Sequence, residues 1–390
     1  MSLDVSRARA DTPACEQVLH FNNAGASLQP ECVLQAVREH IALEAQLGGY
    51  EAAERVADRI DHPHRALAQL LGCAADEIAL VENATRAWDM AFHSLRLNPG
   101  DRILTGRAEY ASNMLSLLQV AQRRGVRVEL IPDDEFGQTS VSALRAMIDE
   151  KVRLIAITHV PSDNGLVNPA EAIGQIAREA GIAYLLDACQ SVGQLPVDVA
   201  AIGCDMLSGT GRKFLRAPRG TGFLYVRRDW IERLDPPFID MHSARRTAPD
   251  QFEIRTDARR FESWEANIAA RIGLGVAADY ANAWGMAAIA ERASGLAGRL
   301  RQRLAAEPGI QVHDRGEYLC AIVTFSKADE PAPALRIRLR DQGIHTWVSL
   351  AEHAGVDYPT GRPAAVVRAS LHYYNTDEEM EQFCRALRGR

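Results

Sequence analysis

Lysine is scarce in this 390-residue chain. Of its 44 basic residues only Lys151, Lys213 and Lys327 are lysines, and the other 41 are arginines. Arginine binds anions through a forked guanidinium group, but its pKa is too high for a nucleophilic amine. Amine chemistry in this protein is therefore restricted to three side chains and the N-terminus.

Long apolar runs are missing as well. No stretch approaches the roughly 20 apolar residues that cross a bilayer, and residues 1–16 lack the apolar core of a signal peptide. We therefore expect a cytoplasmic protein with no membrane partner. A formal net charge of -7 and dispersed arginines argue against a nucleic-acid partner, because such proteins present a basic face.

The seven cysteines are scattered, odd in number and free of Cys-x-x-Cys spacing. This pattern predicts neither a disulfide framework nor a zinc site, and we expect no metal. Most of these cysteines are expected to be small buried apolar side chains. With 47% hydrophobic residues, the chain is long enough for one large core and a second, smaller one.

Helical and strand periodicities alternate from about residue 64. We predict helices at 64–71, 85–95, 113–124, 142–150 and 170–180, and strands at 77–81, 102–104, 126–131, 153–158, 182–186, 205–207 and 222–226. Continuous apolar runs such as residues 154–158 are typical of a parallel sheet covered by helices on both faces. The predicted class is therefore α/β.

Residues 265–304 are alanine-rich and helical in pattern, and Gly285 is placed to divide them into two helices. Further strands at 320–325, 344–347 and 366–371, with helices at 333–340 and from Asp377, predict a small α+β domain. The predicted organisation is an N-terminal segment (1–20) packing with the small domain, a large domain (21–285) and the small domain (286–390).

Lys213 lies in a glycine-rich turn, Ser-Gly-Thr-Gly-Arg-Lys-Phe at residues 208–214, directly after a predicted strand. Such a turn can hold a reactive side chain at the carboxyl edge of an α/β sheet. A Walker phosphate loop is excluded, because its lysine needs Gly before it and Ser or Thr after it. The loop context alone leaves a solvated surface lysine as the alternative.

Two other strand ends carry candidate residues. The Asn-Ala-Thr-Arg turn at 83–86 opens a helix, where free N–H groups can bind a phosphate or serve an ordinary N-cap. Asp187 ends a buried apolar strand, and a buried carboxylate needs a cation or donors to offset its desolvation. A protonated pyridine nitrogen is one such partner; the alternative is an Asp that caps the next helix.

The order of phosphate turn, strand-end Asp and lysine loop resembles the class V aminotransferases, a family of fold-type-I pyridoxal-phosphate enzymes that includes cysteine desulfurases, carbon-sulfur lyases and isopenicillin-epimerase-like proteins. The resemblance runs from FNNAGA at 21–26 to VRASLHYYNT at 367–376, and DACQSVGQLPVDV (187–199) and SGTGRKF (208–214) are its most specific parts. It implies a mainly parallel seven-stranded sheet, a small C-terminal domain and a homodimer with shared active sites.

The resemblance also implies roles for single residues. Lys213 is expected to be the catalytic lysine, which forms a Schiff base with pyridoxal 5'-phosphate. Asp187 is expected to hold the ring nitrogen of this cofactor and Gln190 its ring hydroxyl. The residues assigned to its phosphate are Ala84, Thr85, Arg86, Thr210 and Arg212.

The wall of the site differs from many relatives. Tyr110 stands where they stack a His on the ring, so it keeps a flat face but loses an imidazole. Ser162 aligns where they often carry Asn, and Asp163 or Asn164 is placed to compensate. Tyr50, Trp88 and Trp264 are aromatic candidates for the substrate pocket, with core packing favoured for Trp88.

Arg368 matches the family arginine that clamps the substrate α-carboxylate, a task suited to a planar fork. A surface ion pair is the alternative for this side chain. Ala24 and Gly25 are also assigned to substrate binding.

The absence of a cysteine near Arg368 narrows the range of activities that the resemblance implies. Desulfurases of this family carry a catalytic Cys shortly before the carboxylate-binding Arg, but residues 342–370 contain no cysteine. The expected position falls near His353, a possible proton donor or a solvated loop side chain. A persulfide-forming desulfurase is therefore disfavoured, although loop length varies and Cys320 and Cys384 stay open.

The leading hypothesis is a carbon-sulfur β-lyase acting on an S-substituted cysteine or cysteine sulfoxide. The segments GRKFLRAPRGTGF and RFESWEAN are similar to ergothioneine-pathway sulfoxide lyases and isopenicillin-epimerase-like proteins. An aminotransferase or epimerase with the same cofactor is the alternative, because the same first proton transfer serves all three reactions. A cofactor-free binding protein is the alternative from another class.

Overall fold

The computed structural model describes residues 3–351 and 363–389. Its large sheet has seven strands in the order β2 (Ile78–Val81), β8 (Gly222–Val226), β7 (Met206–Thr210), β6 (Ala183–Asp187), β5 (Val152–Thr158), β3 (Arg102–Gly106) and β4 (Arg127–Ile131). All strands run in one direction except β8, which is antiparallel to both of its neighbours. The predicted mainly parallel seven-stranded sheet is confirmed.

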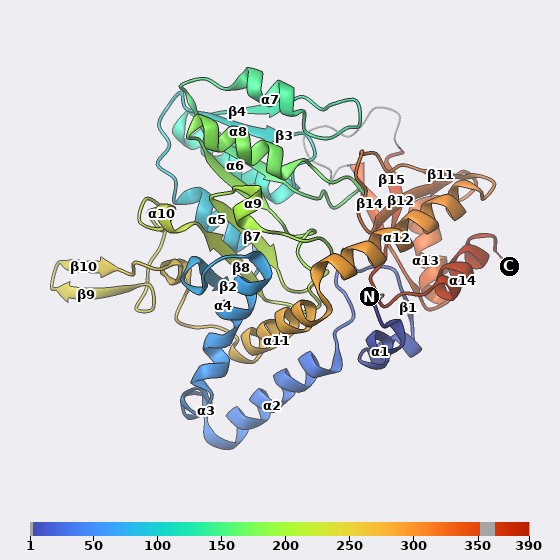
Figure 1. Cartoon of the computed structure of the whole chain (residues 1–390), viewed down its shortest axis with the longest axis horizontal. Helices are drawn as coiled ribbons and strands as arrows, with labels where there is room; N and C mark the ends of the chain where they lie inside the picture. Colours follow the sequence, from blue (N-terminus) through green and yellow to red (C-terminus); the bar gives the residue numbers. More distant parts are fainter. Residues whose placement is uncertain (1–2, 352–362, 390) are drawn as a thin grey trace.

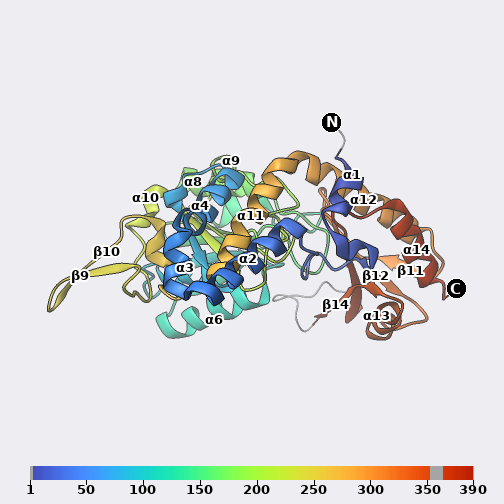
Figure 2. The ribbon, with the colours of Figure 1, turned by 90° about the horizontal axis from the view of Figure 1, so that it is seen from below.

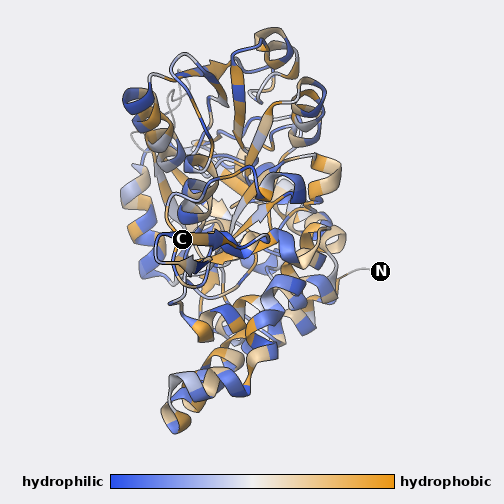
Figure 3. Ribbon diagram, turned by 90° about the vertical axis from the view of Figure 1, so that its left-hand side faces the viewer, coloured by the Kyte–Doolittle hydropathy of each residue, from blue (hydrophilic) through white to orange (hydrophobic). Residues whose placement is uncertain are grey.

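Helices cover both faces of the large sheet (Figure 1). Side chains alternate along β2, so Ile78 and Leu80 join one apolar core while Ala79 and Val81 join another. The first core includes α4 (Ala57–Leu71), α8 (Ala170–Ala180) and α11 (Ile268–Trp284), and the second includes α5 (Ala84–His93) and α6 (Ala111–Arg124). Apolar residues accordingly concentrate on the strands, and polar ones on the outer helices (Figure 3).

A small antiparallel sheet follows, in the order β11 (Ile310–Val312), β12 (Ile322–Lys327), β15 (Ala365–Ser370) and β14 (Trp347–Leu350). It shares a third apolar core with α12 (Met286–Ala305), α13 (Ala332–Asp341) and α14 (Asp377–Leu387). The small sheet lies at one end of an elongated molecule, and the hairpin of β9 (Ala244–Ala248) and β10 (Gln251–Ile254) lies at the other (Figure 2).

The N-terminal segment contacts the small-sheet region. After α1 (Val5–Ala10), β1 (Leu19–His20) pairs in parallel with β13 (Ile344–His345). Arg9 of α1 also donates to Glu379 of α14 at 2.7 Å. The domain bounds at residues 20 and 285 stay predictions.

The remaining helices are α2 (Glu31–Leu47), α3 (Gly49–Arg55), α7 (Val141–Met147), α9 (Val199–Ile202) and α10 (Arg228–Ile231), with 3-10 turns at Pro13–Glu16, Ala75–Glu77 and Ala258–Phe261. None of the helices in the described ranges is long and apolar enough to cross a membrane.

Most predicted elements are present within a few residues of their predicted ends. Gly285, with φ +81°, separates α11 from α12 as expected. The single strand predicted at 344–347 is wrong, because the chain leaves its pairing with β1 after His345 and pairs with β15 from Trp347. The predictions also omit every element before α4, the short helices α9 and α10, the β9–β10 hairpin and β11.

Candidate active site

The predicted site residues gather where the parallel strands of the large sheet end. Asp187 is the last residue of β6 and Thr210 the last of β7, and the loop after β7 carries Lys213. Neighbouring parallel strands end at the same edge of a sheet, which is where α/β proteins bind ligands. Arg368 reaches this edge from β15 of the small sheet.

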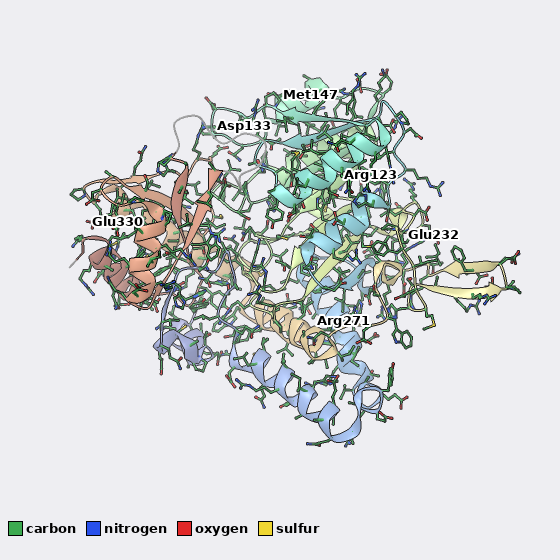
Figure 4. All side chains as sticks on the ribbon, turned by 180° about the vertical axis from the view of Figure 1, so that it is seen from behind. Arg123, Asp133, Met147, Glu232, Arg271 and Glu330 are labelled. Carbon is green, nitrogen blue, oxygen red and sulfur yellow. The ribbon has the colours of Figure 1, made fainter. Side chains whose placement is uncertain are left out.

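A cavity of about 760 Å³ lies between the two sheets among the described residues. It is large enough for a small-molecule cofactor and a substrate together. Asp133, on the side of the large sheet that faces the small sheet (Figure 4), is one of its lining residues. The lining includes eight predicted site residues: Ala24, Gly25, Tyr110, Ser162, Gln190, Arg212, Lys213 and Arg368.

Lys213 is buried, 7% exposed, at the wall of this cavity. Burial lowers the pKa of its amine; the acidic groups of Cys189 and Asp187 oppose this effect, while Arg212 and Arg368 add to it. The neutral amine is the nucleophilic form, so this environment favours Schiff-base chemistry at Nζ.

Asp187 is held from both sides. Its Oδ1 accepts from the Cys189 backbone N–H at 2.9 Å, and its Oδ2 accepts from Asn113 Nδ2 at 2.8 Å. It is 4% exposed and lies beside the cavity without lining it, while its charge acts on Lys213. The hydrogen bond from the Cys189 N–H is local, as in a capping interaction. Capping therefore accounts for the partner of Oδ1 but not for the bond between Oδ2 and Asn113.

Gln190, Ser162 and Arg368 form a hydrogen-bonded row along the cavity. Gln190 Nε2 donates to Ser162 Oγ at 3.0 Å and to the Ala24 carbonyl at 3.1 Å. Arg368 Nη1 donates to the Ser162 carbonyl at 2.6 Å. Ser162 is thus placed by its hydroxyl and its backbone, and Asp163 and Asn164 line the cavity beside it.

The Arg368 guanidinium is 6% exposed on the cavity wall. Burial lowers its pKa to about 10, with Asp163 opposing and Arg212 adding to the effect, so the group is still charged at neutral pH. Its burial is inconsistent with the surface ion pair that was the alternative.

Polar atoms without a protein partner point to a missing ligand. Among the described residues, Gln190 Oε1 and Arg368 Nε are buried and make no hydrogen bond. Buried polar groups are nearly always satisfied, so such atoms fit a site that completes its bonds on binding. Together with the buried amine and the carboxylate beside it, they fit a cofactor that carries an aldehyde and a basic ring nitrogen.

The predicted phosphate residues are divided between two places. Arg212 lines the cavity and donates to the Gly25 carbonyl. Thr210 is buried and bonds the Thr221 carbonyl at 3.2 Å. The other three, Ala84, Thr85 and Arg86, form the first turn of α5 and do not line the cavity described above.

All three aromatic candidates also lie away from this cavity, among the residues that the structure describes. Trp88 is 1% exposed in the second apolar core, as its core-packing interpretation predicts. Tyr50 and Trp264 are 72% and 53% exposed, and neither lines the cavity among the described residues. His353 lies outside the described residues.

The sequence predictions missed three side chains at the site. Trp347 lines the cavity and lies directly opposite Arg368 in the β14–β15 pair, so both project from one face. Glu109 and Asn113 bond each other at 2.9 Å, and Asn113 also bonds Asp187. Glu109 lies before α6, which begins at Ala111, so helical spacing does not predict its contact with Asn113. Trp347 required the strand register.

Comparisons with known proteins agree with this geometry. The family model Aminotransferase class-V matches residues 19–383. The chain belongs to the class V aminotransferase family. It is therefore a pyridoxal-phosphate-dependent enzyme.

Relatives in this family carry different activities. The chain is 32% identical to a probable cysteine desulfurase of Xylella fastidiosa (strain 9a5c), covering 99% of this chain and 95% of the relative. It is 30% identical to a probable hercynylcysteine sulfoxide lyase of Mycobacterium tuberculosis (strain CDC 1551 / Oshkosh), covering 95% and 89%. The solved cysteine desulfurase of Thermococcus onnurineus NA1 is 25% identical, with a TM-score of 0.89 over 100% of this chain and 98% of that one.

Proposed function

We propose that this class V enzyme is a carbon-sulfur β-lyase that acts on an S-substituted cysteine or cysteine sulfoxide. The observation that carries the proposal is a cavity lined by a buried amine and a buried guanidinium, with no cysteine in the segment that precedes the guanidinium. Lys213 and Arg368 line one cavity, while the segment before Arg368, residues 342–367, contains no cysteine.

The thiols elsewhere do not replace the missing cysteine. Burial raises the pKa of Cys189 well above its usual value, and Asp187 adds to this effect, so its thiol is protonated at neutral pH. Burial also raises the pKa of Cys320 to about 12 and that of Cys384, in α14, above its usual value. Since the thiolate is the nucleophile, none of these side chains suits sulfur transfer.

The residue roles follow from position and charge. When bound, pyridoxal phosphate supplies an electron sink for the pair left at Cα. Arg368 holds the substrate carboxylate, while Lys213 Nζ removes the Cα proton. Gln190 and Asp187 are assigned to the ring hydroxyl and the ring nitrogen, and Tyr110 to the ring face.

The overall reaction balances with water as the second reactant. The Cα–H and Cβ–S bonds break, and the sulfur leaves as a thiol from a thioether or as a sulfenic acid from a sulfoxide. Hydrolysis of the remaining three-carbon fragment gives pyruvate and ammonia. No external oxidant or reductant is consumed.

Trp347 is assigned to the group attached to sulfur. Its side chain is 45% exposed, lines the cavity and shares a sheet face with Arg368. The Arg336 guanidinium lies 4.3 Å from its ring centroid, which holds the ring in place. A substrate clamped at Arg368 therefore has a flat apolar surface beside it for a large S-substituent.

We also infer a homodimer that completes the phosphate end of the site. The Arg86 guanidinium lies over Phe238, 4.3 Å from its ring centroid, and the Trp264 backbone N–H donates to Asp240 at 2.7 Å. These two contacts place the first turn of α5 beside a group of exposed apolar side chains, namely Phe238, Ile239, Met241 and Trp264. A second copy that covers this surface would bury Thr85, which is exposed in the single chain.

Borohydride reduction tests the cofactor site. The purified protein is expected to be coloured, and reduction is expected to fix the cofactor on Lys213 rather than on Lys151 or Lys327. Lys213→Ala should abolish the label, whereas Lys151→Ala, a control at an exposed lysine, should keep it. Peptide mass spectrometry identifies the labelled lysine, and a label elsewhere would refute the assignment.

Single-turnover product analysis tests the reaction. Pyruvate and ammonia from S-substituted cysteines, with no protein-bound persulfide, are the expected result. Transfer of the amino group to the cofactor would identify an aminotransferase, and recovery of substrate with inverted configuration would identify an epimerase. A persulfide on any cysteine would overturn the lyase proposal.

A further inference from the structure

The buried carboxyl group of Glu109 has no role in the reaction described above. It follows β3, is 3% exposed and reaches the floor of the site through Asn113 of α6. Asn113 is 2% exposed, and its Nδ2 donates to Glu109 Oε1 at 2.9 Å and to Asp187 Oδ2 at 2.8 Å. A single amide nitrogen therefore joins two buried carboxyl groups.

We propose that Glu109 and Asn113 are positioning residues that fix the orientation and the charge of Asp187 toward the cofactor's ring nitrogen. This inference rests on the role assigned to Asp187 in the proposed function. It does not depend on which reaction follows proton removal at Cα, because it concerns the cofactor alone.

Orientation is the first part of the argument. With Oδ1 held by the Cys189 N–H and Oδ2 by Asn113, the Asp187 carboxylate cannot rotate without losing a buried hydrogen bond. The amide orientation of Asn113 is also determined, since carboxylate oxygens accept and only the NH2 end can donate to both.

Glu109 anchors this chain to the sheet. Its Oε1 also accepts from Thr158 Oγ1 of β5 and from the Tyr110 backbone N–H at 2.9 Å, and its Oε2 accepts from Thr105 Oγ1 of β3 at 3.1 Å. All of these donors are neutral. Partners from β3, β5 and α6 therefore fix Glu109, and it in turn fixes Asn113.

Charge is the second part. Burial raises the pKa of Glu109 to about 7, hydrogen bonds from Thr158 and Asn113 oppose this, and the negative charge of Asp187 adds to it. Asp187 and Tyr184, both on β6, interact electrostatically with Glu109, and burial raises the pKa of the Tyr184 phenol well above its usual value and keeps it neutral. Glu109 therefore titrates near neutral pH while coupled to Asp187.

The shared amide places the Glu109 carboxyl group directly behind Asp187. An ionised Glu109 therefore adds a second negative charge behind the Asp187 side chain. Deprotonation of Glu109 therefore raises the negative potential at Asp187, which favours the protonated form of the ring nitrogen facing it. The visible absorbance of bound cofactor reports this change.

The test uses the full-length holoenzyme and its visible spectrum between about pH 6 and 9. The wild-type spectrum is expected to show a transition near pH 7 that Glu109→Gln removes, because the amide keeps the acceptor oxygen but cannot ionise. Glu171→Gln, which neutralises an exposed carboxylate on α8, should keep the transition. A wild-type-like titration of Glu109→Gln would overturn the charge coupling.

Cofactor affinity tests the orientation. Asn113→Ala is expected to weaken cofactor binding by about tenfold or more, as losses of supporting ligand-orienting contacts do, whereas Glu171→Gln should bind like the wild type. Circular dichroism of each variant reports folding separately. Wild-type affinity in folded Asn113→Ala would refute the positioning role.

These readouts also separate the two proposals. A protein that binds cofactor at Lys213 and shows the Glu109 transition, yet releases no pyruvate from S-substituted cysteines, would refute the lyase and leave the positioning pair intact. The reverse result would refute only the positioning pair.

Discussion

The proposed function assigns Arg368 to the substrate carboxylate and not to the cofactor. Its Nη1 is committed to the Ser162 carbonyl, and its Nε has no partner among the described residues. The guanidinium can therefore donate hydrogen bonds to a carboxylate while its Nη1 stays bonded to Ser162. A lysine offers a point charge and cannot do both.

Arg368→Lys should accordingly raise KM for amino-acid substrates and lower kcat/KM about tenfold to a hundredfold. Steady-state kinetics with the visible spectrum as a companion measurement checks this, since bound cofactor should look unchanged. Arg340→Lys, at an exposed ion pair with Asp341, is the matched control. If KM is unaltered in Arg368→Lys, the carboxylate binds elsewhere.

Trp347 allows a second prediction at this scale. Trp347→Ala should lower kcat/KM for cysteines with large flat S-substituents by about tenfold, roughly the value of a lost aromatic contact, but should change S-methylcysteine much less. Trp347→Phe should recover most of the difference. Equal losses for large and small substituents would show that Trp347 supports the fold rather than selectivity.

At the scale of elements, contacts from distant segments fix the loop that carries Lys213. His372 Nε2 lies 2.7 Å from the Phe214 carbonyl. Arg216, buried with φ +63°, donates to the Tyr373 hydroxyl at 2.6 Å and to Thr12. The loop thus depends on the N-terminal segment and on the turn after β15 for its conformation.

Gly193 also lies very close to the loop that carries Lys213. It has φ +95°, and a Cβ there would lie 2.2 Å from the Phe214 backbone carbon. Gly193→Ala should therefore lower the free energy of unfolding by more than about 2 kcal/mol and reduce cofactor uptake, because strain and overlap displace the Lys213 loop.

Urea denaturation and borohydride labelling measure the two effects of Gly193→Ala. Gly298→Ala in α12, where a Cβ meets nothing within 4 Å, should instead stabilise by about 0.5–1 kcal/mol. If Gly193→Ala takes up cofactor as well as Gly298→Ala does, the close contact does not control the loop.

How far sequence alone predicts each element depends on where its stabilisation comes from. The inner strands of the large sheet, such as β5, β6 and β8, are buried on both faces over most of their length, so their apolar runs are visible in the sequence. The β9–β10 hairpin is largely exposed and polar, so its stabilisation comes from pairing that leaves no apolar pattern. The α2 helix buries few of its residues and is weakly patterned for the same reason.

The same reasoning applies to the site. Continuous motifs contain Lys213, Asp187 and Gln190, and the order of these motifs along the chain allows the residues to be recognised from the sequence. Asn113 and Trp347 enter the site through helix packing and strand register, which depend on partners far away in the chain. The roles assigned to all of these residues remain predictions until the labelling and kinetic tests are made.

At the scale of the whole molecule, buried histidines make stability depend on pH. Burial lowers the pKa of His20 and of His159 to about 4, and that of His372 well below its usual 6.5. These rings stay neutral in the folded protein while the unfolded chain binds protons as pH falls below about 6.5. Stability is therefore lost as pH falls through this range.

Glu109 acts in the opposite direction over nearly the same range. Burial raises the pKa of Glu109 from 4.5 to about 7. Between about pH 4.5 and 7, the folded protein therefore holds a proton that the unfolded chain releases. The three histidines named above take up three protons on unfolding against one released by Glu109, a net difference of about two, and the lowered pKa values of His93 and His345 add in the same direction. At about 1.4 kcal/mol per proton and pH unit, stability should fall by about 3 kcal/mol for each unit between pH 6.5 and 4.5.

Urea denaturation in steps across pH 6.5 to 4.5 measures this slope. Glu109→Gln removes the opposing proton, so it should steepen the slope by about 1.4 kcal/mol per pH unit, while Glu171→Gln should leave it unchanged because its carboxylate is exposed in both states. A wild-type stability that stays constant across this range would mean that the buried rings become protonated without unfolding. The packing that joins His20 and His372 to the N-terminal segment and the Lys213 loop would then tolerate charge.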